Sequence, residues 1–304
     1  MGDRQEHSAA SGAFAFGVVL AVLQAILYAC MGIFGKLLYA TGLGPEEVVI
    51  LRFLCASVLL GAFLLVWRKQ ALVSRQPAVY LQAVFFFLSA LFYFYCVNRL
   101  TAGMTTVIFY TYPAVVALGS SIFFKERFTL TTGLALLLAL GGLVMVSGML
   151  AGGIKLDGLG ILWGIISCVS FAVYTLLIHK TARTEGAFTV TFTLSWTSLL
   201  AACVAFFPKL PFVLQLTPQQ VGLGCGLSLA CTIIPIVLYI EAVKRIGATK
   251  TSLIGISETP FSLFFAFIIL GEVLTLQQGI GSALIVGSIA VITIGPILAE
   301  RKKG

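Results

Sequence analysis

Long runs of apolar residues, separated by short polar segments, cover almost the whole chain. A helix needs about 20 apolar residues to cross the hydrocarbon core of a bilayer, and ten runs reach about this length. These runs lie at residues 14–39, 46–67, 77–98, 101–123, 128–150, 158–180, 187–208, 217–241, 248–270 and 274–298. We therefore expect an all-α integral membrane protein with ten transmembrane helices and short tails at residues 1–13 and 299–304.

Composition supports this expectation. Of the 304 residues, 60% are hydrophobic and only 10% are charged, whereas about a quarter of the residues in soluble domains are charged. The first apolar run is too long for the core of a signal peptide. The net charge of +8 does not indicate nucleic acid binding, because no basic stretch is long enough to form a footprint on it. The chain is expected to lie in the lipid bilayer without a soluble domain.

The basic residues between the apolar runs predict the orientation of the helices. With the N-terminus in the cytoplasm, fourteen Lys and Arg residues fall on the inner side and four on the outer side. The four outer residues are Lys36, Arg99, Lys155 and Lys209. This bias predicts a multi-pass protein of the cytoplasmic (inner) membrane with both termini in the cytoplasm.

Parts of the chain repeat at a constant offset of 146 residues. The segments 99–142 and 245–288 align, with Arg99 matching Arg245 and Thr129 matching Thr275. Each half, 14–150 and 158–298, holds five apolar runs, so the two halves are expected to enter the membrane in opposite orientations. Inverted repeats of this kind are a transporter architecture, with the substrate site near the midplane between them.

Several short segments of the chain form a recognisable pattern. They are Lys36, Gly44-Pro45, Arg52-Phe53, the run from Pro113 to Glu126, and the run from Pro260 to Gly271-Glu272. With the repeat and the number of apolar runs, they make the chain resemble the drug/metabolite transporter superfamily, specifically its EamA-like ten-helix members. The resemblance implies transport of small metabolites such as amino acids, drugs, nucleosides or nucleotide sugars, mostly outward in bacteria. The resemblance also places an arginine at position 52.

Glu258 is the sharpest candidate for function. It lies in the middle of the ninth apolar run, two residues before Pro260, and an ionisable residue at that depth normally faces a cavity or a partner. On a continuous helix it would share one face with Thr251, Gly255 and Ser262. We expect Glu258 to bind a substrate ammonium group and to be the candidate for proton coupling, with Ser262 beside it. A purely structural hydrogen bond or ion pair between helices is the alternative.

The prolines of the two repeats are expected to act as hinges. Pro260 removes a helical donor and would free the carbonyl of Ile256, and Pro113 lies at the corresponding place in the first half. Tyr112, beside Pro113, is the repeat counterpart of Glu258. Its hydroxyl could bond the substrate or Glu258, or the side chain could simply pack.

Other candidates for the cavity come from the first, third and sixth runs. Gln24 and Tyr28 lie one turn apart near the middle of the first run, and Tyr174 is the repeat match of Tyr28. In the third run, the most polar face predicts which side chains line the cavity. That face contains Gln82, Phe86, Ser89, Tyr93 and Cys96. Phe86 and Tyr93 could form walls for the substrate, with packing as the alternative.

Arg52, inside the second run, has two interpretations. Its long side chain could reach the outer surface, where Glu46 or Glu47 could pair with it. It could instead hold a substrate carboxylate or gate the outer mouth.

The pattern as a whole predicts a secondary transporter rather than an enzyme. An amino acid exporter is preferred, because Glu258 could bind the ammonium, Arg52 the carboxylate, and Phe86 with Tyr93 the side chain. An exporter of cationic or aromatic drugs is the rival, and a membrane enzyme or an assembly protein is the alternative from another class.

The sequence has no Walker motif, metal-ligand cluster or nucleophilic triad, so we expect no cofactor and no metal. The expected partners are a small-molecule substrate and the bilayer, and the expected state is a monomer or homodimer. The glycines Gly141, Gly142 and Gly281 predict close helix packing.

Overall fold

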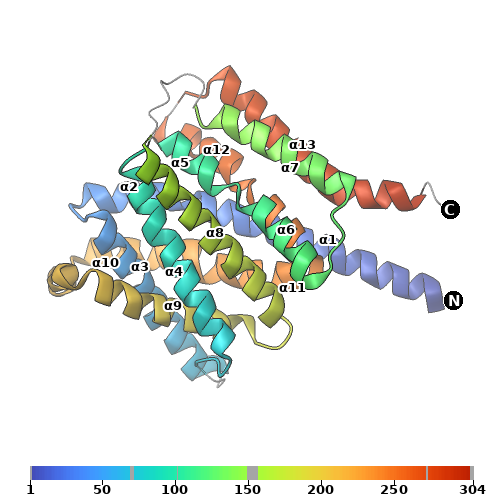
Figure 1. Ribbon diagram of the computed structural model, residues 1–304. Helices are drawn as coiled ribbons and strands as arrows, with labels where there is room; N and C mark the ends of the chain where they lie inside the picture. Colours follow the sequence, from blue (N-terminus) through green and yellow to red (C-terminus); the bar gives the residue numbers. More distant parts are fainter. Residues whose placement is uncertain (1, 69–71, 101, 149–156, 272, 302–304) are drawn as a thin grey trace.

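The computed structural model describes residues 2–68, 72–100, 102–148, 157–271 and 273–301. All regular secondary structure in these ranges is helical (Figure 1). The first half contains α1 (Gly2–Ala29), α2 (Met31–Ala40), α3 (Pro45–Phe63), the π-helix η1 (Leu64–Arg68), α4 (Pro77–Val97), α5 (Ala102–Phe109), α6 (Tyr112–Phe124) and α7 (Leu130–Val146). The second half contains α8 (Gly158–Thr181), α9 (Ala187–Ala205), the 3₁₀ helix η2 (Phe207–Gln215), α10 (Pro218–Ser228), the π-helix η3 (Leu229–Ile233), α11 (Ile234–Gly255), α12 (Glu258–Leu270) and α13 (Leu276–Arg301). Glu272, which carried part of the resemblance, lies outside the described residues.

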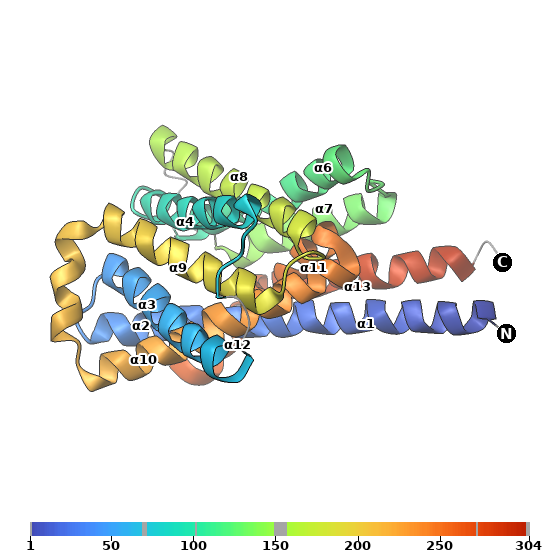
Figure 2. The ribbon, with the colours of Figure 1, turned by 90° about the horizontal axis from the view of Figure 1, so that it is seen from below.

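The expectation of a ten-helix membrane protein is confirmed. In the described part of the chain, seven helices are long and apolar enough to cross a membrane, and three shorter apolar helices accompany them. The short ones are Pro77–Tyr93, Leu130–Val146 and Glu258–Ile269. The chain is helical beyond the first and last predicted spans, since α1 already begins at Gly2 and α13 continues to Arg301, and the tails at residues 1–13 and 299–304 remain a prediction. Figures 1 and 2 show the start of α1 and the end of α13 on the same side of the molecule.

Several of the predicted spans are broken rather than straight. The first consists of α1 and α2, the fourth of α5 and α6, and the ninth of the last part of α11 and α12. The expected break between the eighth and ninth spans is reduced to a kink inside α11 at Gly247, with φ 83° and ψ 166°. Only glycine adopts this backbone conformation readily.

The breaks in the fourth and ninth spans match each other. The fourth is interrupted at Tyr110 and Thr111 and the ninth at Ile256 and Ser257, which lie 146 residues later. The ends of the two second segments match as well, since Lys125 after α6 and Gly271 after α12 both have left-handed backbones, with φ 55° and 67°. The repeat seen in the sequence is therefore accompanied by a repeat in local backbone geometry.

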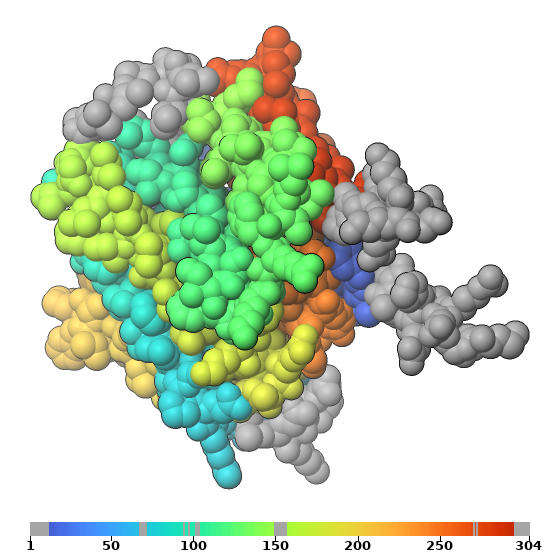
Figure 3. Space-filling model, turned by 45° about the vertical axis from the view of Figure 1, so that its right-hand side comes forward, coloured from blue at the N-terminus to red at the C-terminus, as the bar shows by residue number. Residues whose placement is uncertain are grey.

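Helices from the two halves pack directly against each other. Backbones of the two halves approach closely between α7 and α13, where a Cβ on either Gly142 or Gly281 would lie 2.5 Å from the carbonyl oxygen of the other glycine. This confirms the predicted role of these two glycines, whereas Gly141 has open space beside it. In the space-filling view, the green atoms of α6 and α7 lie between the red atoms of α13 and the yellow-green atoms of α8 (Figure 3).

Candidate functional site

A cavity of about 340 Å³ lies at the level of the helix breaks. Its walls come from α1, α2, α3, α4, α5, α6, α8, α10, α11 and α12, together with Tyr110 at the break. It continues along α2 as far as Lys36 and Tyr39, and Tyr39 and Met31 there are exposed on the protein surface. The cavity is therefore open at the α2 end.

Nine of the ten side chains proposed as substrate-binding line this cavity. They are Gln24, Tyr28, Arg52, Phe86, Ser89, Tyr93, Tyr112, Tyr174 and Glu258. Ser262 does not line it. The shared face with Thr251 and Gly255 was wrong, because it assumed a continuous helix, and the chain turns at Ile256 and Ser257 before α12 begins.

Glu258 is the first residue of α12. The amide groups in the first turn of a helix carry partial positive charge, so this position favours a carboxylate. Tyr110, from the break in the fourth span, is a hydrogen-bond partner of the Glu258 side chain. The break thus places one acidic group at the wall of the cavity, at the start of a half-helix.

The prolines occupy the first turn of the half-helices rather than the breaks themselves. Pro113 is the second residue of α6 and Pro260 the third residue of α12, where a missing N–H leaves no helical bond unmade. We had expected the carbonyl of Ile256 to be free. It is not free, because it accepts a hydrogen bond from the amide of Thr259 at 3.0 Å. A hinge at either break remains a prediction.

Tyr112 lines the cavity, but its hydroxyl forms a hydrogen bond with α11 rather than with Glu258. Its hydroxyl donates to the carbonyl of Ser252 in α11, at 3.4 Å. A Cβ on Gly255 would lie 3.2 Å from that hydroxyl, so the absence of a side chain at Gly255 makes room for the tyrosine. Tyr112 therefore joins the fourth span to the ninth.

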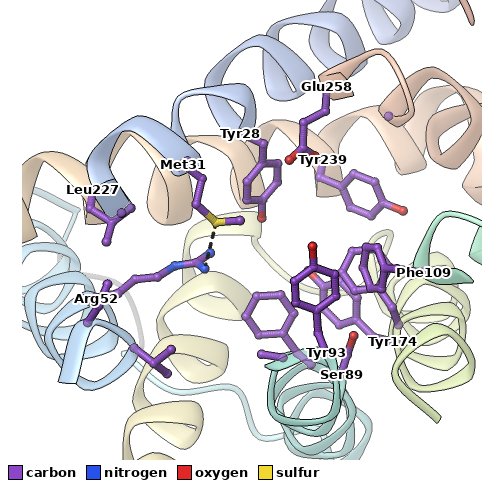
Figure 4. A pocket seen from close by; sticks show the side chains of 18 of the residues that line it. Tyr28, Met31, Arg52, Ser89, Tyr93, Phe109, Tyr174, Leu227, Tyr239 and Glu258 are labelled. Atoms are coloured by element: carbon purple, nitrogen blue, oxygen red, sulfur yellow. Dashed lines mark hydrogen bonds between the residues drawn. The ribbon is translucent and has the colours of Figure 1, made fainter. Parts of the chain in front are cut away.

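Arg52 points into the cavity and is fixed by groups of the eighth span. Its Nε donates to the hydroxyl of Thr232 at 2.6 Å, and its Nη2 donates to the carbonyl of Cys231 at 2.8 Å. That carbonyl is available because Pro235, four residues later, has no N–H to donate to it. A third contact joins Nη1 to the sulfur of Met31 at 3.4 Å (Figure 4).

The expected surface pairing of Arg52 is not what the structure shows. Among the described residues, neither Glu46 nor Glu47 forms a salt bridge with it. Glu47 instead accepts a hydrogen bond from the amide of Gly44 and caps α3. The arginine is directed inward because the eighth span offers it a hydroxyl and an unpaired carbonyl.

Between Arg52 and Glu258 the cavity wall is aromatic. Figure 4 shows the two charged side chains entering the cavity from opposite sides, with Tyr28 between them and the hydroxyl of Tyr93 pointing inward. The rings contact one another: Phe86 lies 5.0 Å from Tyr174, Tyr93 5.3 Å from Phe109, and Tyr112 4.7 Å from Phe171, measured between centroids. The arrangement could hold an organic molecule that has two groups of opposite charge and an apolar or aromatic part.

Sequence reasoning missed several members of the wall. Phe109, Tyr110, Phe171, Leu227 and Tyr239 line the cavity. Tyr239 donates its hydroxyl to Thr175 at 3.1 Å. Phe109 and Tyr110 precede the Tyr112-Pro113 pair, and Phe171 lies three residues before Tyr174 on α8. The available signal for these residues was their closeness in sequence to residues that we had already proposed to line the cavity.

At the end of the protein away from α2, a polar cluster joins the two halves. Glu126, just after α6, accepts a hydrogen bond from the hydroxyl of Thr249 at 2.9 Å. Its other oxygen lies 3.7 Å from Nδ1 of His179, and that nitrogen accepts the amide of Ala248 at 3.3 Å. The kink at Gly247 brings this segment close, since a Cβ there would lie 3.0 Å from Glu126. We call Glu126, His179, Gly247, Ala248 and Thr249 the closing cluster.

In the part of the chain that the structure describes, no three or more His, Cys, Asp or Glu side chains gather in a way that could hold a metal ion. The polar groups of the cavity itself are one carboxylate, one guanidinium, one lysine and several hydroxyls and amides. These groups suit reversible binding of an organic molecule.

Comparisons with known proteins agree with this architecture. The sequence profile of the EamA-like transporter family matches residues 15–148 and 158–294. The chain is 25% identical over 282 residues to "Uncharacterized transporter YcbK" of Bacillus subtilis, covering 88% of this chain and 89% of that protein. It is 28% identical over 210 residues to "Uncharacterized transporter" of Archaeoglobus fulgidus, covering 69% and 73%. A solved crystal structure superposes with a TM-score of 0.74 over 95% of this chain and 99% of its own, at 20% identity, which supports the fold.

Proposed function

Since the chain belongs to the EamA-like transporter family, we propose that it is a secondary transporter of the cytoplasmic membrane that exports amino acids. The observation that carries this proposal is the pair of opposite charges, Glu258 and Arg52, facing one cavity across an aromatic wall. An amino acid has an ammonium for the first, a carboxylate for the second and a side chain for the wall.

The size and the bonding of the cavity support the proposal. Small-molecule sites occupy about 300–1,000 Å³, and this cavity of about 340 Å³ is at the small end of that range. Arg52 has five N–H groups, and the three protein contacts leave donors for a carboxylate. Because those contacts fix the guanidinium, a substrate does not have to order it.

Transport by alternating access follows from the two halves. We propose that residues 14–150 and 158–298 are inverted five-helix repeats that rock around the cavity. The structure then corresponds to one of two states, open along α2 and shut at the closing cluster. By the distribution of basic residues, the open end faces outward and the closing cluster faces the cytoplasm, with both termini inside.

Two couplings are compatible with this cycle. In the first, Glu258 takes up a proton from outside when the cavity is empty and releases it to water on the cytoplasmic side when a substrate ammonium group displaces it, so export is driven by proton exchange. In the second, the substrate leaves by facilitated diffusion and Glu258 only binds it. Either cycle can run in a monomer or in each subunit of a homodimer.

An exporter of cationic or aromatic drugs is the second candidate. One observation favours it: three nitrogens of Arg52 already have protein partners, and the rest of the wall is rich in aromatic rings. Such a transporter would need Glu258 and the rings but no carboxylate site. A membrane enzyme or an assembly protein has less support, because neither role accounts for a cavity with opposite charges between two repeats.

Counterflow in proteoliposomes tests the proposal. Vesicles preloaded with an unlabelled amino acid should accumulate the same labelled amino acid, and Glu258→Gln and Arg52→Gln should both abolish the accumulation. Glu241→Gln and Arg245→Gln are matched controls, since these residues pair with each other outside the cavity. Accumulation that survives Arg52→Gln but not Glu258→Gln would favour the drug exporter. The absence of counterflow for every amino acid would refute the proposal.

A further inference from the structure

Three groups that can accept hydrogen bonds line the cavity together with Gly255, namely the amide of Gln24, the hydroxyl of Tyr112 and the carboxylate of Glu258. Gln24 from α1 is 4% exposed, and its Oε1 is buried without a hydrogen-bond partner. The hydroxyl of Tyr112 lies beside it, since a Cβ on Gly255 would be 3.9 Å from Gln24 Oε1 and 3.2 Å from Tyr112 Oη. Glu258 follows Gly255 by three residues and lines the same cavity.

This group of residues has more acceptors than donors. Tyr112 directs its hydrogen to the carbonyl of Ser252, so its oxygen keeps lone pairs for another donor. Tyr110 is a partner of Glu258, but a carboxylate has room for further donors. Arg52 directs its bonds to Thr232, Cys231 and Met31 at the opposite wall. The acceptor Oε1 of Gln24 is left without a donor from the protein.

A buried acceptor without a partner is unfavourable, and of the two described glutamines with a buried unpaired Oε1, Gln24 and Gln82, only Gln24 lines the cavity. In a binding cavity the missing donor is naturally supplied by the ligand. The aromatic rings nearby could attract any cation through their faces, with or without N–H groups. Gln24 distinguishes these cases, because its carbonyl gains a bond only from a cation that carries N–H.

We propose that Gln24, Gly255 and Glu258 form a subsite for an ammonium group with at least two N–H donors, one for Gln24 Oε1 and one for the Glu258 carboxylate. Gln24 is then the residue that selects against fully N-methylated cations. The inference rests on the transport function proposed above and adds the chemistry of the substrate's cationic end.

Gly255 provides the room for this subsite. A methyl group at this position would be tighter against Tyr112 Oη than an ordinary contact, at 3.2 Å. Any larger side chain would occupy the space between Tyr112 and Gln24. Gly255→Ala should therefore weaken binding of amines, whereas Gly222→Ala, at a helical glycine that does not line the cavity and has nothing within 4 Å, should not.

The test compares two pairs of ligands by isothermal titration of the purified protein. One pair is phenylalanine and N,N,N-trimethylphenylalanine, and the other is 2-phenylethylamine and its N,N,N-trimethyl derivative. The native protein should prefer the unmethylated member of each pair that binds by about tenfold or more, the size expected for a buried acceptor that loses its partner. Gln24→Leu should reduce this preference at least fivefold.

Gln82→Leu is the matched control. Gln82 is also a fully buried glutamine with an unpaired Oε1, but it does not line the cavity, so the preference should remain. Gln24→Asn, which keeps the carbonyl but withdraws it by one methylene, provides a second variant if Gln24→Leu does not fold. Its preference should also fall.

Each outcome decides between the claims. Equal binding of the methylated ligands by the native protein, or an unchanged preference in Gln24→Leu and Gln24→Asn, would overturn the subsite. Binding of 2-phenylethylamine with an intact preference, but none of phenylalanine, would keep the subsite and overturn amino acid export. No binding of any of the four ligands would overturn both.

Discussion

Arg52 in α3 donates a hydrogen bond from Nη2 to the carbonyl of Cys231, 179 residues later in the chain, at 2.8 Å. Pro235, four residues after Cys231, has no N–H with which to form an α-helical bond to this carbonyl. The Cys231 carbonyl of the second half thus holds in place the Arg52 guanidinium, which belongs to the first half and lines the cavity. The pair joins the two halves and shapes the proposed carboxylate site at once.

Arg52→Lys should destabilise the protein although it keeps the charge. A lysine ammonium is a single point of donation and cannot reach both Thr232 and Cys231 as the planar guanidinium does. Hydrogen bonds to charged groups contribute about 1.5–3 kcal/mol each, so the midpoint of thermal unfolding in detergent should fall. Arg245→Lys, at a partly exposed pair, should leave the midpoint within a degree or two. Equal midpoints for the native protein and Arg52→Lys would contradict the structural role of this bond.

Gly142→Ala and Gly281→Ala should each destabilise the packing of α7 against α13. The added methyl would lie 2.5 Å from a backbone oxygen of the facing helix, and backbone cannot move aside as a side chain can. Overpacking of this kind costs about 1–3 kcal/mol. Gly141→Ala is the control, with nothing within 4 Å, and it should be neutral or slightly stabilising. The order of stability of the three variants can be measured by thermal unfolding. A Gly141→Ala protein that is less stable than Gly142→Ala would refute the predicted order.

The sequence predicted the ten spans well, because span length and apolar content depend on local composition alone. It also placed Glu258 in the cavity, since a carboxylate in an apolar run has few other places to go. It failed on Ser262, because the face shared with Gly255 required a straight helix, and the chain turns at Ile256 and Ser257. The partners of Arg52 were out of reach, because they depend on how η3 and Pro235 lie against α3.

Lys125→Gly should stabilise the protein, and Gly271→Ala should destabilise it. Both residues end a half-helix with a left-handed backbone, which costs an L-residue roughly 1–2 kcal/mol. Replacing Lys125 removes that cost but adds freedom to the unfolded chain, so the gain should be at most about 1 kcal/mol. Opposite shifts in the unfolding midpoint are expected. A loss of stability in Lys125→Gly would indicate that the lysine side chain is needed.

Weakening the closing cluster should make the closed end open more often. Thr249→Val removes the donor to Glu126, and Glu126→Gln replaces the carboxylate that accepts this bond by a weaker neutral acceptor. Backbone amides of residues 247–256 should then exchange with deuterium faster, as followed by mass spectrometry. Ser195→Ala is the control, because that hydroxyl bonds only within α9, to Thr191. If deuterium exchange of these amides is unchanged in Thr249→Val and Glu126→Gln, the closing cluster does not control the opening of this end.

The central claim is that one amino acid bridges Glu258 and Arg52, and a titration with phenylalanine and 2-phenylethylamine tests it most directly. The two ligands differ only by the carboxylate. The account predicts that Arg52→Gln weakens binding of phenylalanine about tenfold or more and leaves 2-phenylethylamine unchanged, whereas Glu258→Gln weakens both. Equal effects of Arg52→Gln on the two ligands, or no effect of Glu258→Gln on either, would contradict it.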